Sequence, residues 1–297
     1  MWDFERPEPG SYQSAGGDAV YDSIVEAKQS AGMHPEAEFT GGERRRARLI
    51  ARDVGTYHRK QVVRKHFEDS LVLDNISFRY RDDAAYIFEG MNLTVKKGQA
   101  VAIIGASGAG KSTLVDILLG LLVPQQGRVT VDGASITGMP DEWTEMVGYV
   151  PQSVFLLSGS IRENVAFGIE PDDIDDELVE DVLRHAELYD FVRTLPDGAD
   201  TLVGDRGVRL SGGQRQRIAI ARTLYHSPEI MVLDEATSAP DNETETAIMS
   251  AIDALQGQVT LIIVAHRLTT IKNCDVIYEV VDKNIRIRDK ADVLRGV

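Results

Sequence analysis

Residues 105–113 bring together the residue types that bind phosphate groups. Glycine lets the backbone wrap around a phosphate so that its N–H groups point inward. The Lys111 ammonium supplies a positive charge to the β- and γ-phosphates of a nucleotide, and the Ser112 hydroxyl is a suitable ligand for Mg²⁺. A glycine-rich turn that joins a strand to a helix and binds nothing is the alternative. The segment consists of Gly105, Ala106, Ser107, Gly108, Ala109, Gly110, Lys111, Ser112 and Thr113.

Two carboxylates end a second segment, residues 230–235. The four apolar residues at 230–233 predict a buried strand, and Asp234 and Glu235 follow them. Asp234 is suited to a further contact with Mg²⁺, directly or through water. Glu235 is suited to polarising an attacking water as a general base. Strands often end in acidic turn residues, so the pair gains its meaning from the phosphate-binding segment.

A third segment, residues 210–214, opens a predicted helix. Ser211 and Gln214 have the spacing of a capping box, in which the two side chains satisfy free backbone N–H groups at a helix start. A cap does not explain Gly212 and Gly213, because glycine costs a helix about 1 kcal/mol relative to alanine. A helix start without bulky side chains lets an anion approach the backbone, so this segment, which begins at Leu210, is a second candidate for phosphate contact.

These segments need a scaffold, and the surrounding pattern predicts one. Residues 100–104 are apolar throughout and predict a buried strand, and residues 259–264 predict another. Apolar residues at helical spacing follow the phosphate-binding segment, at Leu114, Ile117, Leu118 and Leu121. Alternating apolar residues predict a half-buried strand through Ile76, Phe78 and Tyr80. Strands that alternate with helices predict a mainly parallel α/β sheet.

Together the three segments resemble the motifs of the ATP-binding cassette (ABC) ATPases. Residues 105–113 resemble the Walker A motif, residues 230–235 the Walker B motif and residues 210–214 the signature motif. The resemblance covers about residues 70–297 and implies an ATPase that uses ATP and Mg²⁺. It also implies an α/β fold: a P-loop NTPase (RecA-like) core with a small antiparallel β-subdomain and an inserted α-helical subdomain at about residues 153–222.

The resemblance assigns roles to further residues. Tyr80 is similar to the aromatic residue that stacks on adenine, with an ordinary strand aromatic as the alternative. Gln152 is similar to the glutamine that touches Mg²⁺ and water, and His266 to the histidine that contacts the γ-phosphate. The implied catalytic set is Lys111, Gln152, Glu235 and His266, and the implied Mg²⁺ ligands are Ser112, Gln152 and Asp234.

The family pairs two cassettes head to tail, which implies that a second cassette is a partner. Its members place the signature and the D-loop on the ATP held by the opposite subunit. Residues 238–241 resemble the D-loop, but Pro240 stands where the family usually has leucine. Proline removes a backbone donor and fixes φ, so communication between the two sites is expected to be altered. The implied residues acting in trans are Leu210, Ser211, Gly212, Gly213, Gln214 and Asp241.

Residues 155–165 and 203–207 resemble the exporters and flippases within the family. There the first segment lines a groove for helices of the membrane domain and the second contacts them. The resemblance implies a transmembrane domain as partner, on the same parent chain or a separate subunit, and a place at the cytoplasmic face of the plasma or inner membrane. Two other classes stay open: a soluble ABC ATPase of translation or DNA repair, and a module that binds nucleotide without hydrolysing it.

The amino-acid composition argues against several other properties, namely general nucleic-acid binding, an internal disulfide and a membrane span. The chain has 297 residues, of which 43% are hydrophobic and 27% charged, and a net charge of −15. General nucleic-acid binding is not expected, because phosphate contacts need clustered lysine and arginine. The single cysteine, Cys274, excludes an internal disulfide. No apolar stretch reaches the roughly 18–20 residues of a membrane span. Residues 1–69 are predicted to be an N-terminal linker and helical extension, partly disordered and with a basic run at 44–65, and residues 70–297 are predicted to be the cassette.

Overall fold

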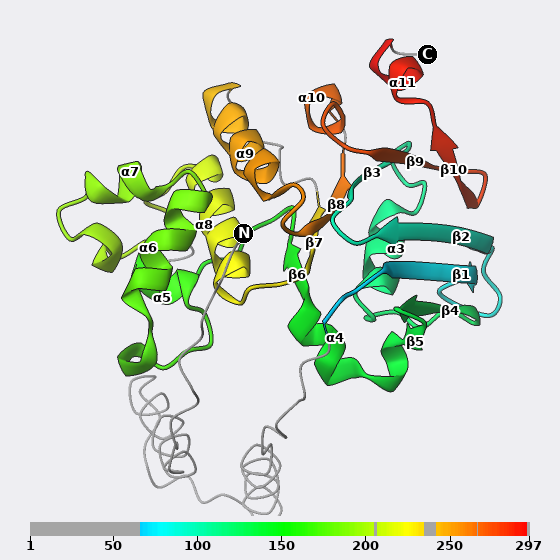
Figure 1. Cartoon of the computed structure of the whole chain (residues 1–297), viewed down its shortest axis with the longest axis horizontal. Helices are drawn as coiled ribbons and strands as arrows, with labels where there is room; N and C mark the ends of the chain where they lie inside the picture. The colour runs from blue at the N-terminus through cyan, green and yellow to red at the C-terminus, as the bar shows by residue number, and fades with distance from the viewer. Residues whose placement is uncertain (1–65, 205–206, 235–241, 266, 296–297) are drawn as a thin grey trace, which may run out of the picture. The chain divides into compact units, whose positions relative to one another are not determined.

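The computed structural model describes residues 66–204, 207–234, 242–265 and 267–295 (Figure 1). The chain divides into two units, Met1–Val63 and Arg64–Val297, and every described residue belongs to the second. The basic run at 44–65 and nearly all of the predicted linker therefore lie outside the described residues. The exception is residues 66–69, where the Phe67 side chain is buried in the core.

Six strands form the larger sheet, in the order β10-β9-β3-β8-β7-β6. All neighbouring pairs from β9 to β6 are parallel, and β10 is antiparallel to β9. The mainly parallel α/β sheet expected from the sequence is confirmed. Its strands are β3 (Ala100–Ile104), β6 (Val147–Val150), β7 (Ile230–Asp234), β8 (Thr260–Val264), β9 (Val276–Val281) and β10 (Asn284–Arg288).

Four strands form a smaller antiparallel sheet, in the order β2-β1-β4-β5. Figure 1 shows it beside the larger sheet, with α3 (Lys111–Leu118) close to both. Apolar side chains from the two sheets and α3 share one core, which fixes the start of α3 relative to both sheets. The strands are β1 (Ser70–Phe78), β2 (Phe88–Lys96), β4 (Gln126–Val131) and β5 (Ala134–Ser135).

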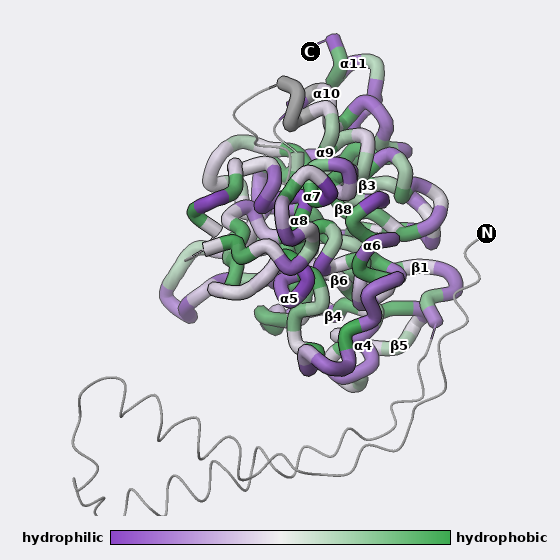
Figure 2. The backbone as a smooth tube through the Cα atoms, turned by 90° about the vertical axis from the view of Figure 1, so that its left-hand side faces the viewer, coloured by the Kyte–Doolittle hydropathy of each residue, from purple (hydrophilic) through white to green (hydrophobic). Residues whose placement is uncertain are grey.

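Most helices of the described residues follow β6, and α5, α6, α7 and α8 group together in Figure 1. Figure 2 shows hydrophilic and hydrophobic colour alternating along α6, whose Val179, Val182 and Leu183 are buried. The helices besides α3 are α4 (Pro140–Met146), α5 (Ile161–Val165), α6 (Asp176–His185), α7 (Tyr189–Arg193), α8 (Gly212–Tyr225), α9 (Asn242–Leu255), α10 (Leu268–Ile271) and α11 (Lys290–Arg295). Short 3₁₀ turns are η1 (Ile136–Gly138), η2 (Pro171–Asp173) and η3 (Gly198–Asp200).

The larger sheet separates two hydrophobic cores. Successive residues of a strand point to opposite faces, so Ala102 of β3 joins the core that contains Ile218 of α8. Ile103 of the same strand joins the core that contains Leu114 of α3. This double burial explains why β3 is apolar throughout. It also places α3 and α8 on opposite faces of the sheet.

Two expectations about local structure were wrong. Leu121 does not extend the apolar face of α3: the helix ends at Leu118, Gly120 follows with φ +76°, and Leu121 is exposed. Tyr80 does not lie in a half-buried strand, because β1 ends at Phe78 and the tyrosine is exposed. Among the described residues, no helix combines the length and apolar character that crossing a membrane requires.

Candidate functional site

Neighbouring parallel strands of the larger sheet end at one edge, and the predicted site residues follow them. Carboxyl ends of parallel strands lie on the same edge, where α/β proteins bind ligands. Residues 105–110 follow β3, Asp234 ends β7, and Gln152 stands two residues beyond β6. The structure therefore brings together groups that are separated by up to 129 positions along the chain, the interval from residue 105 to residue 234.

Two glycines of the loop between β3 and α3 are required by close packing. Gly105 has φ +151°, and a Cβ there would lie 2.7 Å from the Val280 carbonyl oxygen of β9. Gly110 has φ +109° and precedes α3, where a Cβ would lie 2.8 Å from Ile87 Cγ2. Side chains at both positions would push the loop away from the sheet edge. The glycine spacing read from the sequence thus corresponds to two positions at which the loop packs closely against neighbouring residues.

Lys111 begins α3 and is almost fully buried. Its Nζ donates hydrogen bonds to the carbonyl oxygens of Gly105, at 2.8 Å, and Ala106, at 3.0 Å, so the ammonium lies against the loop. Ser112, the next residue, is exposed. The first backbone N–H groups of a helix have no acceptor within the helix, and together with the helix dipole they favour an anion. The loop, Lys111 and Ser112 form a site suited to phosphate.

Tyr80 is tied to the start of the same helix. Its hydroxyl lies 3.0 Å from Thr113 Oγ1, and its ring meets the Phe78 ring edge to face, with centroids 5.1 Å apart. The ring itself stays accessible, with 59% of the residue exposed. An aromatic face that is fixed at its hydroxyl end and open on its surface can stack on a planar ring. This exposure argues against the interpretation of Tyr80 as an ordinary strand aromatic.

Asp234 has a neighbour that the sequence did not single out. Tyr149 lies on β6, which pairs with β7, and its hydroxyl is hydrogen-bonded to the Asp234 carboxylate. Burial raises the pKa of Tyr149 to about 12, and the negative charges of Asp234 and Asp116 contribute to the increase. The phenol therefore stays neutral and remains a hydrogen-bond donor to Asp234 at physiological pH.

Of the remaining residues predicted at this edge, Gln152 is among the described residues. Gln152 is exposed on the loop that follows β6. Glu235, Pro240, Asp241 and His266 lie outside the described residues, so the roles implied for them stay predictions. In sequence, Glu235 directly follows β7 and His266 comes two positions after β8.

The signature segment forms a complete capping box at the start of α8. Gln214 N–H donates to Ser211 Oγ at 3.2 Å, and Ser211 N–H donates to Gln214 Oε1 at 2.8 Å. Leu210 is buried beneath the cap, and Gly213 is also buried, whereas Ser211 is exposed. The cap expected from the sequence is confirmed, and the serine hydroxyl remains at the surface.

The signature segment and the phosphate loop precede helices on opposite faces of the larger sheet. The helix capped by Ser211 packs on one face, and the helix that begins at Lys111 packs on the other. A single chain thus presents two helix starts suited to anions on opposite sides of one sheet (Figure 1).

Several residues joined to these segments carried no recognisable signal in the sequence. Tyr149 of β6 contacts Asp234 of the adjacent strand β7. Thr113 contacts Tyr80, which is 33 positions away in the sequence, and Arg222 of α8 contacts Phe155, which is 67 positions away. Such partners become neighbours only through the sheet and helix packing. A pattern of spacing along the chain cannot reveal them.

Comparisons with known proteins agree with this geometry. The family model described as "ABC transporter" matches residues 88–238. ABC transporter BEA3 of Gibberella fujikuroi is 43% identical over 207 residues, which are 69% of this chain and 16% of that protein. The ATP-dependent lipid A-core flippase of Saccharophagus degradans is 44% identical over 206 residues, which are 69% of this chain and 35% of that protein.

Among solved structures, a bacterial Atm1-family ABC exporter with ATP bound has a TM-score of 0.70 and 35% sequence identity. The similarity covers 84% of this chain and 46% of that one. The chain thus spans less than half the length of each of these proteins.

Proposed function

This chain belongs to the ABC transporter family, and from that premise we propose that it is the ATP-hydrolysing cassette of an exporter or flippase. Two cassettes would close head to tail around two ATP molecules and drive a membrane domain. The observation that carries the proposal is the sheet edge at which the phosphate loop follows β3, Asp234 ends β7 and Gln152 follows β6, three strands of one parallel sheet. This edge supplies a phosphate site and a carboxylate from one rigid support.

The nucleotide would be held by the loop and by Tyr80. Backbone N–H groups of residues 105–113 would bind the phosphates, and Lys111 would exchange its contacts with the Gly105 and Ala106 carbonyl oxygens for the β- and γ-phosphates. The exposed ring of Tyr80 would stack on adenine. Its hydroxyl would keep the bond to Thr113, so the ring and the phosphate loop would hold a fixed separation.

The residues at this edge also suit Mg²⁺. The ion prefers oxygen ligands and is commonly bound through one or two carboxylates together with substrate phosphates and water, and the exposed Ser112 hydroxyl and the Asp234 carboxylate are of that type. Gln152 would add a side-chain oxygen. Bound there, the ion would neutralise the charge that develops on the phosphates, while Tyr149 would hold Asp234 by its hydrogen bond.

Hydrolysis requires a water positioned on the γ-phosphate. Glu235 would take a proton from this water as general base, and His266 would contact the γ-phosphate. From the partner cassette, the N-terminal end of α8 with Ser211 and Gly213, and Asp241 of the D-loop, would approach the same phosphate. The placement of α3 and α8 on opposite sheet faces supports this arrangement in trans.

The membrane domain would dock on the helical region. Phe155, Leu157 and Phe167 are 58%, 45% and 47% exposed and lie in or next to the segment that resembles the coupling groove of exporters. Apolar side chains gathered on a surface commonly mark a protein interface. The cassette would thereby sit at the cytoplasmic face of the plasma or inner membrane, with the membrane domain on the same parent chain or a separate subunit.

Substitution of Glu235 by glutamine tests the proposal. Loss of a general base costs about 10²–10⁴ in rate, so Glu235→Gln should release phosphate at least a hundredfold more slowly than the unaltered chain. It should also accumulate as an ATP-bound dimer in size-exclusion chromatography. Glu145→Gln, which alters an exposed carboxylate on α4, is the matched control. Unchanged hydrolysis by Glu235→Gln would remove Glu235 from this role.

A further inference from the structure

Arg222 connects the helix that begins at the signature segment to a distant loop. It lies in the last turn of α8, half-buried, and burial lowers the pKa of its guanidinium. Its Nε donates to the Asn164 carbonyl oxygen at 2.8 Å, and its Nη1 donates to the Phe155 carbonyl oxygen at 3.0 Å. One side chain of α8 therefore holds both the loop after β6 and helix α5.

Asn164 extends this connection through the loop. Its side chain is fully buried, and its Oδ1 accepts hydrogen bonds from Arg222 Nη2, at 3.0 Å, and from Leu157 N–H, at 2.9 Å. Its Nδ2 donates to the carbonyl oxygens of Leu157, at 3.0 Å, and Ser160, at 2.9 Å. The amide thus closes residues 157–160 against α5, and Arg222 holds the amide in place.

The groups held in this way carry exposed apolar side chains, Phe155, Leu157 and Phe167, which we call the aromatic face. Arg222 holds Phe155 by its carbonyl oxygen and Leu157 through Asn164. Its guanidinium also lies over the Phe167 ring, 5.2 Å from the centroid, a distance typical of a cation–π contact. His226, just beyond α8, lies with Nε2 3.2 Å from the Phe167 carbonyl oxygen. All three members of the face are thus positioned from the end of α8.

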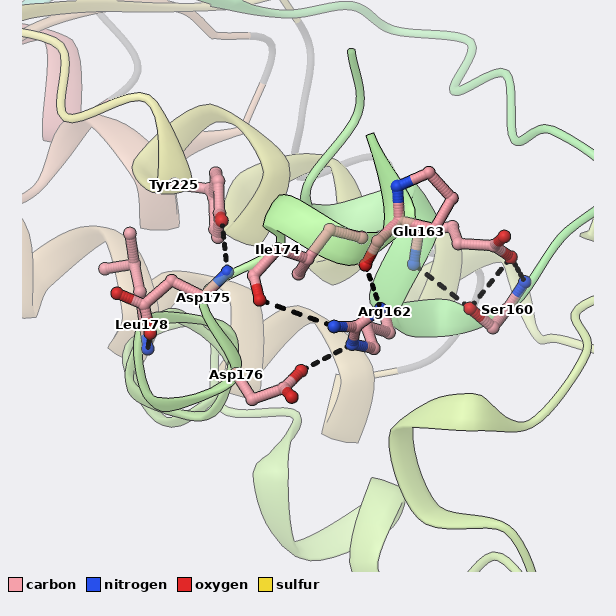
Figure 3. A network of polar contacts seen from close by, with 9 residues as sticks. Ser160, Arg162, Glu163, Ile174, Asp175, Asp176, Leu178 and Tyr225 are labelled. Atoms are coloured by element: carbon pink, nitrogen blue, oxygen red, sulfur yellow. Dashed lines mark hydrogen bonds and ion pairs between the residues drawn. The ribbon is translucent and has the colours of Figure 1, made fainter. Parts of the chain in front are cut away.

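Further contacts make this part of the helical region one body (Figure 3). The Tyr225 hydroxyl, at the last residue of α8, accepts a hydrogen bond from Asp175 N–H at 3.0 Å, next to the start of α6. Arg162 of α5 bonds the Asp176 carboxylate and the carbonyl oxygens of Pro171 and Ile174. Helices α5, α6 and α8 are therefore tied together at the end of α8 opposite the signature.

We propose that Arg222 is a positioning residue that transmits the position of the signature helix to the aromatic face. When the N-terminal end of α8 contacts a nucleotide and the helix is displaced, Phe155, Leu157 and Phe167 would then move together with the helix. The guanidinium suits this task because its rigid fork of donors bonds several acceptors at once. The proposal rests on the proposed function, since it takes the signature end of α8 to respond to ATP.

Hydrogen–deuterium exchange of the full 297-residue chain tests the coupling. The exchange of three peptides, at residues 105–113, 155–160 and 211–216, is compared with and without magnesium and the non-hydrolysable analogue AMP-PNP. In the unaltered chain, all three should change. In Arg222→Gln, the nucleotide-dependent change should be lost at 155–160 and kept at 105–113 and 211–216. A merely structural role would loosen 155–160 equally in both states and keep the difference.

Two further variants sharpen the test. Arg217→Gln alters another arginine of α8, which bonds the Glu187 carbonyl oxygen instead of the aromatic face, and should keep the nucleotide-dependent change at 155–160. Arg222→Lys retains the charge but not the fork and should restore part of the change. Equal loss in Arg217→Gln and Arg222→Gln would contradict the proposal, as would an unaltered response in Arg222→Gln.

The results for the unaltered chain distinguish a failure of the proposed coupling from a failure of the proposed function. A response at 105–113 and 211–216 without one at 155–160 would overturn the coupling alone and leave the proposed function standing. An absence of any response at 105–113 would show that the phosphate loop does not bind the nucleotide. It would overturn both the proposed function and the coupling.

Discussion

At the scale of single residues, the proposed phosphate binding depends on the Lys111 side chain, which the backbone of residues 105–110 holds in position. The carbonyl oxygens of Gly105 and Ala106 fix the Lys111 ammonium within the loop. Its contacts with neutral carbonyl oxygens are weaker than those it could make with charged phosphates. A nucleotide would therefore replace the existing partners of Lys111 rather than require a new conformation of the loop.

Substitution of Lys111 by methionine should weaken ATP binding. A hydrogen bond to a charged group contributes about 1.5–3 kcal/mol, so the dissociation constant should rise about tenfold to a hundredfold. Isothermal titration calorimetry with ATP measures this change. Lys97→Met, at an exposed position between β2 and β3, is the control and should bind like the unaltered chain. Equal affinity of Lys111→Met and Lys97→Met would exclude a phosphate contact of Lys111.

Two substitutions of Tyr80 separate its ring from its hydroxyl. Stacking of a base on an aromatic side chain contributes about 1–3 kcal/mol, so Tyr80→Ala should raise the dissociation constant of ATP about fivefold to a hundredfold. Tyr80→Phe keeps the ring and loses only the bond to Thr113, so its effect should be clearly smaller. The same calorimetric titration compares both. Similar losses in the two variants would mean that the hydroxyl, and not the stacked ring, matters for binding.

At the scale of secondary-structure elements, caps and packing fix where each helix begins. The start of α5 is a complete capping box: Ser160 Oγ accepts a bond from Glu163 N–H at 3.1 Å, and Ser160 N–H donates to Glu163 Oε2 at 2.6 Å. The hydrogen bond from Ser160 N–H, together with a second that Ser160 Oγ donates to Glu163 Oε2 at 2.9 Å, lowers the pKa of Glu163 below its usual value. The cap therefore stabilises α5 together with the loop that Asn164 closes.

Removal of the Ser160 hydroxyl should destabilise the fold by about 1 kcal/mol, the usual contribution of a helix N-cap. Because the folded state lowers the pKa of Glu163, its carboxylate contributes stability above the unfolded pKa of about 4.3. That contribution is lost as the pH falls through the lower folded pKa. Urea unfolding of Ser160→Ala at pH 7 and pH 3 measures both effects, with Ser153→Ala in the exposed loop as control. A difference in unfolding free energy that stays constant between the two pH values would contradict the role of Glu163.

The elements that the sequence predicted best are those with continuous apolar runs and clear ends. Strands β3, β7 and β8 are buried on both faces, so nearly all their residues are apolar, the exceptions being Asp234 at the end of β7 and Thr260 at the start of β8. The capping pattern at Ser211 marks the start of α8. Leu121 fits the helical spacing but falls beyond Gly120, whose positive φ ends the α3 turn. The periodic spacing of apolar residues alone does not reveal where a helix ends.

The candidate site could be predicted only where its chemistry is local. Within each of the segments 105–113 and 210–214, the residues are consecutive in the sequence and form a recognisable motif. Tyr149 and Arg222 act through a carboxylate and backbone carbonyl oxygens brought near by folding. Carbonyl oxygens belong to every residue, so no residue type marks such a partner in the sequence.

At the scale of the whole molecule, the two candidate anion sites belong to helices on opposite faces of the larger sheet. The phosphate loop begins the helix on one face, and the signature begins the helix on the other. A closed symmetric dimer would present each signature to the other chain's loop, as symmetric assemblies repeat the same contact twice. The central claim is therefore that each catalytic site contains residues of two chains.

Mixing two variants that are each impaired in ATP hydrolysis tests this claim most directly. Lys111→Met removes the phosphate contact, and Ser211→Gly removes the signature hydroxyl while keeping most of the helix cap, since glycine costs an N-cap only about a few tenths of a kcal/mol. Each variant alone should hydrolyse ATP slowly, because both sites of its dimer are defective. A mixed dimer contains one site with both residues intact, so an equal mixture should recover up to about one quarter of the unaltered rate. A mixture that forms dimers but stays as inactive as its two components would contradict sites shared between chains.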